Sequence, residues 1–503
     1  MKRPSSLSLD PGVSSKPKFE SLEFIDGDDP FQTHYSHRSS TSSKSTCLLS
    51  SRELALSNVS TPLIKPQIHK KLLHTDSSSS YLDLLGNYLD VFFTLSSSYF
   101  EEYQNAYILH ILNHLYKTKT QITKNDQLPD PVKDQGFSPT KILVLFPYKK
   151  NAKVFIEKLV EIHCKGKKKK MTKSSRRKFT EVFEEAEDAE VSDAFKLGVV
   201  LGDKRELQLF TPFKASDMII ASPMSLRQAI LNESEDENAK ENLGILCSIE
   251  MVVMENSEVF LMQNWDHIET IFKAMNRIPD RDSMTADINR IRDPFIEEKS
   301  KEYRQLIIFS EFISPLLLSL FNRNENYKGK AKTIDHYPGV NQYDVVQKYR
   351  KFRASSQLSA ADERFEYFTQ NLWPNIKEDL YPKSILFVAS YFEYIRVKAY
   401  LEENDPGVLC ISEYTQKSDK QRSIANWKNG KNKAICVTER FLYFRPQKFD
   451  DIGHLVFYSL PEFNNFYEEF ARESKEVISV YCKFDGYSLQ RIVGDKKAGQ
   501  LLK

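Results

Sequence analysis

The feature that most constrains the fold of this chain is a repeated pattern of short, almost wholly apolar runs that end in polar residues or proline. Such runs are typical of central strands in parallel sheets, which are buried on both faces. In the first part of the chain they are Ile142–Phe146, Met218–Ala221, Met251–Met254 and Gln305–Phe309. A second series follows at Ser384–Val388, Val408–Ile411, Ala434–Val437, His454–Phe457 and Val477–Tyr481. The chain therefore contains two groups of predicted buried strands.

Segments with apolar residues at helical spacing alternate with these runs. They begin at Tyr81 and predict helices over 107–115, 152–162, 391–401 and 419–427. Strands that alternate with helices are joined by right-handed crossovers and form parallel sheets. A chain of 503 residues is also too long for a single core. We therefore predict an α/β protein with two lobes, over residues 81–335 and 336–503, the first with N-terminal helices and a basic and acidic insertion near 163–192.

Residues 1–80 lack this periodicity and are rich in serine. Runs such as 39–43 and 77–80 cannot bury enough apolar area to offset the entropy lost on ordering, so we predict a disordered N-terminal tail. The first residues contain no apolar signal-peptide core, and no stretch reaches the roughly 18 apolar residues that a membrane span needs. The sequence therefore predicts a soluble protein that is not secreted and does not bind a membrane.

Global charge and cysteine usage exclude few functions. Lys and Arg number 71 against 69 Asp and Glu, so the formal net charge of +2 favours no particular partner. The 6 cysteines are scattered without a C-x-x-C pair, as expected of reduced core residues in an intracellular protein. His110 and His114 share one helix face at a spacing that can bind zinc, but no third ligand follows, and core or surface histidines are expected. We predict no metal and no cofactor.

The densest positive charge lies in the predicted insertion. It runs through Lys167, Lys168, Lys169 and Lys170 and continues with Lys173, Arg176, Arg177 and Lys178. One hypothesis is a nuclear or nucleolar address that also contacts RNA phosphates. The alternative is a solvated loop, partly neutralised by the acidic residues between 181 and 190. We favour the address with RNA contact, because the run lies where packing does not require it.

The strand at Met251–Met254 leads into Glu255-Asn256-Ser257-Glu258, where two metal-binding carboxylates stand in helicases of superfamily 2. Phosphoryl transfer also needs a cradle of backbone N–H groups and a Lys around the nucleotide phosphates. No G-x-x-x-x-G-K-[ST] motif occurs in the 503 residues. We therefore interpret Glu255 and Glu258 as polar residues that cap a strand, rather than as an ATPase site.

Other strand ends resemble helicase motifs in the correct order. Phe146–Lys150 resembles the "PTRE" turn, Ala221–Pro223 "ATP" and Ser310–Phe312 "SAT", whereas the later Arg-rich element is replaced by Phe470–Ser474. Four strings carry a closer resemblance, to the digestive organ expansion factor family, and they are Ser222–Arg227, Phe260–Trp265, Ser412–Ser418 and Thr438–Phe441. This resemblance runs from about residue 81 to the last residue. Members of that family are U3 small nucleolar RNA-associated proteins of the small-subunit processome.

The resemblance implies two RecA-like helicase lobes in a nuclear, nucleolar protein that is not an enzyme and binds no nucleotide. The implied role is a non-catalytic scaffold for pre-rRNA processing towards 18S rRNA, with processome proteins and pre-rRNA or U3 small nucleolar RNA as partners. An active RNA-dependent ATPase or helicase with divergent motifs is the alternative. A protein-only adaptor is a third hypothesis.

Several residues at strand ends are candidates for binding RNA or a partner. Besides the basic run, they are Lys149, Lys150, Tyr414, Gln416, Lys417, Thr438 and Arg440. Parallel strands end at the edge of the sheet where such folds bind ligands. Tyr414 offers a ring on which a base can stack, and the others offer hydrogen bonds or charge. The alternatives are a solvated lysine pair at the start of a helix, and strand-end residues that only hold their turns.

Overall fold

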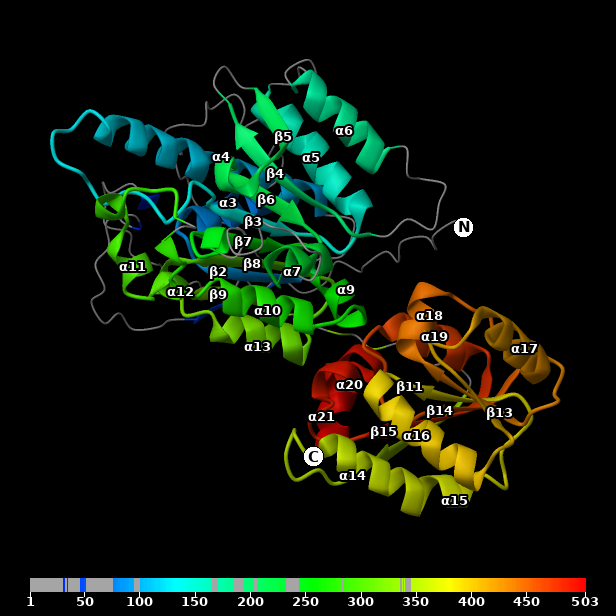
Figure 1. Cartoon of the computed structure of the whole chain (residues 1–503). Coiled ribbons are helices and arrows are strands. Elements are labelled where there is room, and N and C mark those ends of the chain that lie inside the picture. Colours follow the sequence, from blue (N-terminus) through cyan, green and yellow to red (C-terminus); the bar gives the residue numbers. More distant parts are fainter. Residues whose placement is uncertain are drawn as a thin grey trace. The chain divides into compact units, whose positions relative to one another are not determined.

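The computed structural model describes residues 30–31, 34, 46–50, 76–94, 100–164, 171–184, 193–202, 206–231, 244–281, 284–334, 337, 339 and 345–503. The chain divides into two compact units. Unit 1 comprises Met1–Phe312 and Leu317–Asp335, and unit 2 comprises Ile313–Leu316 and His336–Lys503. Both are α/β units built on mainly parallel sheets, which confirms the predicted fold class (Figure 1).

Nine of the described strands form the sheet of unit 1, in the order β1-β9-β2-β8-β7-β3-β6-β4-β5. Their bounds are β1 Thr46–Ser50, β2 Asp90–Thr94, β3 Ile142–Leu145, β4 Lys196–Leu201, β5 Leu207–Thr211, β6 Met218–Ala221, β7 Met251–Met254, β8 Gln305–Ser310 and β9 Lys330–Ile334. Among these strands the antiparallel pairings are β4 with β5 and β4 with β6, and the other pairings are parallel. The central strands β3, β6, β7 and β8 are buried along their whole length, as their apolar runs predicted.

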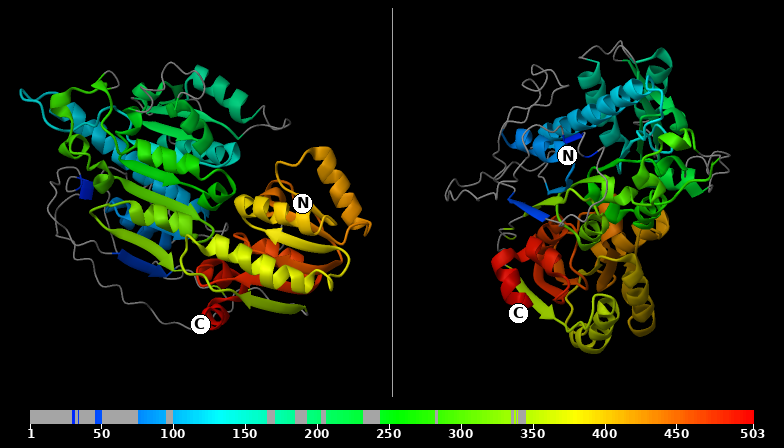
Figure 2. Two further views of the ribbon diagram at one scale, coloured as in Figure 1. Left: turned by 60° about the horizontal axis from the view of Figure 1, so that its bottom comes forward. Right: turned by 90° about the vertical axis from the view of Figure 1, so that its left-hand side faces the viewer.

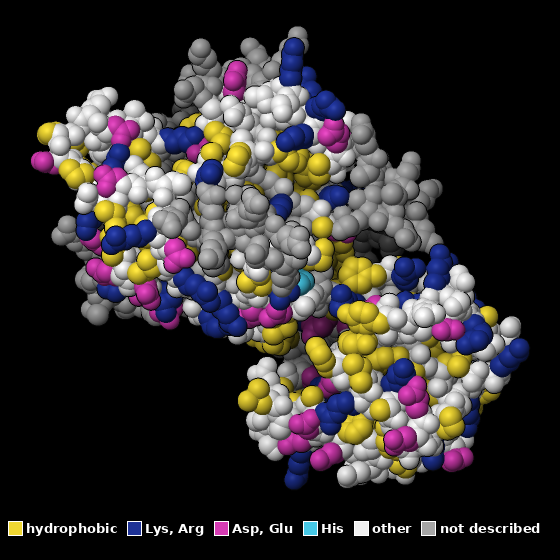
Figure 3. Space-filling view, viewed as in Figure 1, with side chains coloured by type: hydrophobic (Ala, Val, Ile, Leu, Met, Phe, Trp, Pro, Cys, Tyr) yellow, Lys and Arg dark blue, Asp and Glu magenta, His cyan; other side chains and the backbone are white. Residues whose placement is uncertain are grey.

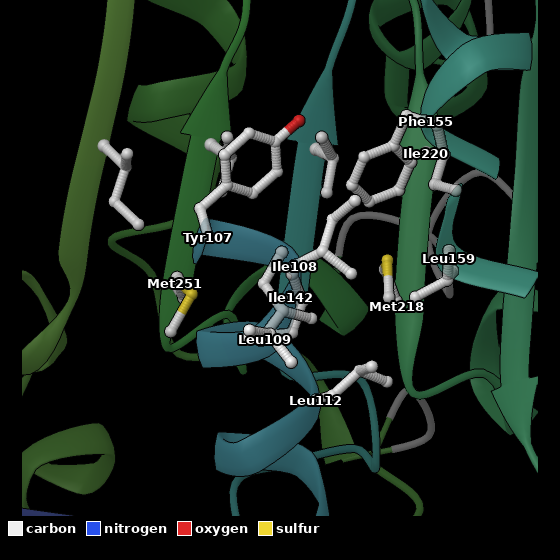
Figure 4. Packing of buried hydrophobic residues seen from close by; sticks show 14 of the residues in the cluster. Tyr107, Ile108, Leu109, Leu112, Ile142, Phe155, Leu159, Met218, Ile220 and Met251 are labelled. Carbon is white, nitrogen blue, oxygen red and sulfur yellow. The ribbon is translucent and has the colours of Figure 1, made fainter. Parts of the chain in front are cut away.

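Helices cover both faces of this sheet. They are α3 Asp76–Gly86, α4 Phe100–Asn125, α5 Lys149–His163, α6 Lys173–Phe183, α7 Pro223–Leu231, α9 Ser257–Met262, α10 Asp266–Ala274, α11 Asp293–Ile296, α12 Ser300–Tyr303 and α13 Pro315–Arg323. Side chains of α3, α4, α5 and α6 share one hydrophobic core with one face of the sheet. In Figure 4, Tyr107 and Leu112 of α4 and Phe155 of α5 pack over Ile142 and Met218 of the sheet. Helix α5, which begins at the candidate residues Lys149 and Lys150, is therefore packed against the core.

Three described parts of the first 80 residues belong to unit 1. Strand β1 pairs parallel with β9 at one edge of the sheet, and α3 begins at Asp76. Phe31 and His34 are buried. The remaining positions of the predicted tail lie outside the described residues, as do Lys167–Lys170 of the basic run.

Unit 2 contains a sheet of six described strands, in the order β10-β15-β14-β11-β13-β12, and all its pairings are parallel. The strands are β10 Val346–Lys351, β11 Ser384–Val388, β12 Val408–Ile411, β13 Ala434–Thr438, β14 Ile452–Phe457 and β15 Ser474–Tyr481. All five runs predicted for this half are strands. The edge strand β10 was not predicted, because its polar sequence lacks an apolar run.

The helices of unit 2 also lie on both faces of its sheet (Figures 1 and 2). They are α14 Ala360–Tyr367, a π-helical turn Phe368–Leu372, α15 Trp373–Ile376, α16 Tyr391–Asn404, α17 Lys417–Lys428, α18 Glu439–Phe444, α19 Asn464–Arg472, α20 Gly486–Val493 and α21 Asp495–Leu502. Residues from 352 to 401 fill the core on one face. No helix within the described ranges is long and apolar enough to span a membrane.

A buried cluster of charges fastens the amino ends of the central strands in unit 1. Glu250, directly before β7, lies 3.1 Å from Lys141 Nζ, 3.5 Å from Arg292 and 3.1 Å from His114 Nε2. Burial alone would raise the pKa of Glu250, but Lys141, His114 and Arg292 together hold that pKa well below its usual value. The carboxylate is therefore ionised inside the core, where it offsets the charge of two cations.

Substitution of Glu250 by Gln should lower the free energy of unfolding by about 3 kcal/mol or more, because two buried cations would face a neutral amide. Chemical denaturation of the parent and of Glu250→Gln measures this difference. Glu297→Gln is the matched control, since it removes an exposed ion pair with Lys299 and should change stability by less than about 0.5 kcal/mol. Equal effects of the two substitutions would contradict a structural role for the cluster.

Candidate functional site

The carboxyl ends of β2, β8 and β7 are neighbours in the sheet of unit 1. In nucleotide hydrolases a phosphate-binding loop follows one such strand and opens a helix. The corresponding connection here joins β2 to α4, and residues 95–99 read Leu-Ser-Ser-Ser-Tyr. It supplies neither glycine for close backbone approach nor Lys for the phosphates. The structure thus locates where the missing motif would stand.

Helix α4 covers the first strand-end carboxylate. Tyr107 donates a short hydrogen bond to Glu255 Oε2, and Gln104 Nε2 donates to both carboxylate oxygens, at 3.0 and 3.3 Å. Glu255 retains only 1% of its accessible surface. Its oxygens are therefore occupied by side chains from the helix that follows the site of the missing phosphate loop.

The environment of Glu255 also removes its charge. Burial raises its pKa from 4.5 to about 8, although hydrogen bonds from Tyr107 and Gln104 oppose the shift. The carboxyl group is thus mostly protonated near pH 7. A divalent cation such as Mg²⁺ prefers anionic oxygen ligands with room for water. A buried and neutral Glu255 does not fit that requirement.

The remaining residues of the tetrad hold the turn after β7. Asn256 has a left-handed backbone, with φ of 50°, and accepts a short hydrogen bond from Asn151. Ser257 Oγ donates to the carbonyl of Met254 at 3.1 Å. Glu258 accepts from the backbone N–H of Glu311 at 3.0 Å, which joins this turn to the one after β8. Burial, with a contribution from Glu311, raises the pKa of Glu258 to about 7. These contacts agree with the interpretation of polar strand caps.

The corresponding edge of unit 2 carries most of the predicted binding residues. Thr438, at the end of β13, donates from Oγ1 to Glu413 Oε2 at 2.8 Å and caps α18 by accepting from the N–H of Phe441 at 3.2 Å. Arg440 Nε lies 3.7 Å from Glu413 Oε1. Lys420 Nζ donates to the carbonyl of Glu413 at 2.8 Å. Glu413, which sequence analysis did not select, therefore joins the ends of β12 and β13.

Four aromatic rings and Arg440 lie around this junction, and we call them the aromatic platform: Tyr391, Phe392, Tyr414 and Phe444 with Arg440. Tyr391 and Tyr414 meet edge to face, with ring centres 4.7 Å apart. The Arg440 guanidinium lies 6.0 Å from the ring centre of Tyr414 and 5.9 Å from that of Phe444. Phe392, Tyr414 and Phe444 are 81%, 63% and 44% exposed. Figure 3 shows hydrophobic side chains grouped beside Lys and Arg on this unit.

Large exposed rings that lie together mark an interaction surface in a folded protein. Sequence analysis found Tyr414, Thr438 and Arg440 of this region but not Tyr391, Phe392 or Phe444. The signal for Phe392 was present, because Ala389–Phe392 follows a predicted strand as Ser412–Tyr414 does. Phe444 lies inside a helix, and its sequence position gives no sign that it is exposed.

The other candidate residues lie at solvent but make fewer contacts. Gln416 and Lys417 are exposed at the start of α17, and Lys150 is exposed at the start of α5. Lys149 is half-buried, and its backbone N–H donates to Asp193 at 3.4 Å. Arg176 and Arg177 are exposed on α6, where Arg177 Nε pairs with Glu181 at 2.8 Å. The buried face of α6 carries Phe179 and Phe183, so this part of the predicted insertion does take part in packing.

The two histidines with a possible zinc spacing are core residues. His110 Nε2 bonds Gln305 Oε1 at 2.8 Å, whereas His114 bonds Tyr88 Oη at 2.9 Å and Glu250 Oε2 at 3.1 Å. Over the part of the chain that the structure describes, no group of three or more His, Cys, Asp or Glu side chains is placed to hold a metal ion.

Two protein-family models match this chain. The family model described as "UTP25, NTP hydrolase-like domain" matches residues 88–331, and "Utp25, C-terminal domain" matches residues 340–503. The "U3 small nucleolar RNA-associated protein 25 homolog" of Xenopus tropicalis is 29% identical over 488 residues, which cover 87% of this chain and 63% of that protein. "Protein NUCLEOLAR FACTOR 1" of Arabidopsis thaliana is 28% identical, covering 84% and 63%. The chain thus spans less than two thirds of both relatives.

Among solved structures, "DEAD-box helicase Mss116 bound to ssRNA and UDP-BeF" is 13% identical to this chain. The alignment covers 89% of this chain and 81% of that one, with a TM-score of 0.34.

The environment of Glu255 predicts a pH dependence of stability. Its pKa of about 8 in the folded chain exceeds the ordinary 4.5, so the folded state keeps a proton that the unfolded chain has lost. The stabilisation from this group is therefore complete below about pH 4.5 and is lost as the pH rises through about 8. The Gln side chain of Glu255→Gln cannot ionise. The melting temperature of this variant should therefore rise relative to that of the parent between about pH 6 and pH 9.

Thermal melts across that range measure the gap between the two proteins. Glu157→Gln on the exposed side of α5 is the control and should differ from the parent by a constant amount. If the difference in melting temperature between Glu255→Gln and the parent is equally constant, Glu255 is ionised in the folded protein. The interpretation of Glu255 as a buried and neutral group would then be wrong.

Proposed function

The chain belongs to the UTP25 family, and on that premise we propose that it is a non-catalytic scaffold with the fold of a nucleotide hydrolase. It acts in the small-subunit processome, in the nucleolus, where pre-rRNA is processed towards 18S rRNA. The names of its relatives support this role, because they refer to U3 small nucleolar RNA and to the nucleolus. Processome proteins, pre-rRNA and U3 small nucleolar RNA are the proposed partners.

The observation that carries the non-catalytic assignment is the closure of Glu255 by α4. A phosphoryl-transfer site needs a cation held by ionised carboxylates beside a phosphate cradle. Here the carboxyl group is buried and mostly protonated, and the β2–α4 connection contains no glycine and no lysine. Opening the site would require Tyr107 and Gln104 to leave a packed core.

The aromatic platform supports a binding role for unit 2. Exposed rings present faces on which unpaired bases stack, and such stacking is worth about 1–3 kcal/mol per base. Arg440 lies between two of these rings, and Lys417 is exposed at the start of α17 after the Tyr414 turn. This combination of rings and cations favours single-stranded RNA over a purely protein partner.

The chain should neither bind ATP tightly nor hydrolyse it. In a titration of fluorescent ATP with Mg²⁺ we expect no saturation below about 1 mM, since the cradle is missing and Glu255 is buried and mostly protonated. An active RNA helicase in the same assay is the positive control. A micromolar dissociation constant would contradict the proposal, as would ATP turnover that Glu255→Gln abolishes.

A combined Tyr414→Ala, Lys417→Ala, Arg440→Ala variant should melt close to the parent temperature, because Tyr414 and Lys417 are exposed and Arg440 makes only a partly exposed ion pair with Glu413. It should fail to support 18S rRNA maturation and processome association. Its RNA affinity should fall, and loss of two cations should reduce the slope of log affinity against log salt by roughly two. Cellular complementation, co-sedimentation and RNA binding at several salt concentrations measure these effects.

Leu358→Ala, Lys398→Ala, Lys431→Ala is the matched control, since it also removes one large side chain and two cations from the surface of unit 2. It should behave as the parent. Normal rRNA processing in the test variant would refute the surface assignment. Lost processome association with unchanged RNA binding would instead assign the platform to a protein partner.

A further inference from the structure

Two side chains from the N-terminal region are buried in unit 1. Residues 35–75 separate them in the sequence from helix α3. Phe31 and His34 each keep 1% of their accessible surface. Residues 30, 31 and 34 are helical, and a spacing of three places both side chains on one face of a helical turn. They lie outside the matched family domain, which begins at residue 88.

The ring of His34 lies in a slot made by tyrosines of that domain. It stacks on Tyr88 with ring centres 4.2 Å apart and an angle of 4°, and on Tyr327 at 5.5 Å and 14°. Tyr303 closes a third side at 6.2 Å. Burial, with Arg292 and neighbouring charges, lowers the pKa of His34 well below 6.5. The imidazole thus occupies the slot as a neutral aromatic ring.

Phe31, three positions before His34 in the sequence, contacts α4. Its ring meets His114 of α4 edge to face at 5.7 Å, and Lys117 Nζ lies 5.7 Å from its centre. Phe31 is part of the main hydrophobic core of unit 1. Burial of such a ring removes a large apolar surface from water, which favours the docked state. Phe31 therefore supplies the apolar anchor, and His34 supplies a shape that only a flat ring can match.

We propose that Tyr88, Tyr303 and Tyr327, with His114 and Lys117, form a docking slot for a Phe-x-x-His peptide. Its occupants in this chain are its own Phe31 and His34, bound in cis. The walls of the slot come from the folded domain and the occupant comes from a separate stretch, so the contact is that of a receptor and a tethered ligand. It anchors the N-terminal region to unit 1.

The sequence around the segment suits this site. Asp28 and Asp29 directly precede Pro30, and a carboxylate followed by proline is a typical helix start. Arg292 and Lys328 both act on His34 and Lys117 lies over Phe31, but Glu250, which pairs with Arg292, also acts on His34. A peptide with a Phe and a His three positions apart is therefore the ligand class that the slot recognises.

A labelled peptide of residues 26–38 tests the proposal on the full chain. In the parent the cis segment competes at an effective concentration in the millimolar range, so the peptide should bind poorly. A Phe31→Ala, His34→Ala chain vacates the slot and should bind it at least about tenfold more tightly. The gain should disappear when the peptide carries Phe31→Ala, or when the vacated chain also carries Tyr327→Leu. Fluorescence anisotropy gives these dissociation constants.

Equal binding to the parent and the vacated chain would overturn the slot. A dimer of the parent that Phe31→Ala, His34→Ala dissociates would overturn the cis assignment in favour of a second copy. If the vacated chain fails to fold, acylation of His34 by diethyl pyrocarbonate decides. His34 should react at least about tenfold more slowly in the parent than in the free peptide, and equal rates would refute the proposal.

Discussion

Both units depend on the burial of parallel strands on two faces. Such strands must be apolar along their length, so polar side chains are displaced to the edge where the strands end. That edge is therefore where chemistry or recognition can arise in either unit. In unit 1 it carries Glu255 and Glu258, and in unit 2 it carries Glu413, Thr438 and Arg440. The two edges share one origin and differ in what covers them.

In unit 1 the edge is closed from within by side chains. Hydrogen bonds from α4 satisfy Glu255, and Glu258 fastens the turn after β8. Unit 2 also contains a buried carboxyl group that holds a neighbouring turn. Glu439 accepts hydrogen bonds from the backbone N–H groups of Glu462 and Phe463 at 3.1 and 2.9 Å. Burial raises its pKa to about 8. These buried carboxyl groups stabilise the turns at the strand ends. The exposed part of the unit 2 edge carries aromatic rings and cationic side chains instead.

Strands with an unbroken apolar run could be predicted from sequence, whereas strands with polar residues in their sequence could not. Runs such as Met251–Met254 are apolar because both faces are covered, and this leaves an unmistakable pattern. Strand β10 reads Val-Gln-Lys-Tyr-Arg-Lys, since an edge strand exposes part of its surface to water. Strand β9 lies between β1 and β2, and its sequence Lys-Ala-Lys-Thr-Ile is interrupted by two lysines. Strand β2 was also missed. The turn before it lies at Tyr88, which has a positive φ of 62°, and a tyrosine gives no sequence signal for a turn.

The candidate site was predictable only in part, for a related reason. The sequence places Tyr414, Thr438 and Arg440 at strand ends, and strand ends can be located. It does not show that Gln104 and Tyr107 reach Glu255, because that contact joins residues about 150 positions apart. It also does not distinguish the exposed Phe444 from the buried Phe441 in the same short helix. Contacts between distant elements and the facing of single helical residues require the folded chain.

A closed edge also changes the balance between stability and function. A working hydrolase keeps ionised carboxylates and unsatisfied N–H groups ready for a ligand, at a cost to the stability of the empty protein. In unit 1 the carboxyl groups of Glu255 and Glu258 are satisfied by internal hydrogen bonds. The exposed rings of unit 2 have no such internal solution, since three of them retain 44% to 81% of their surface. A surface of that kind exposes the free chain to aggregation and becomes stable when covered. It is therefore the surface of unit 2 on which we propose that a partner binds.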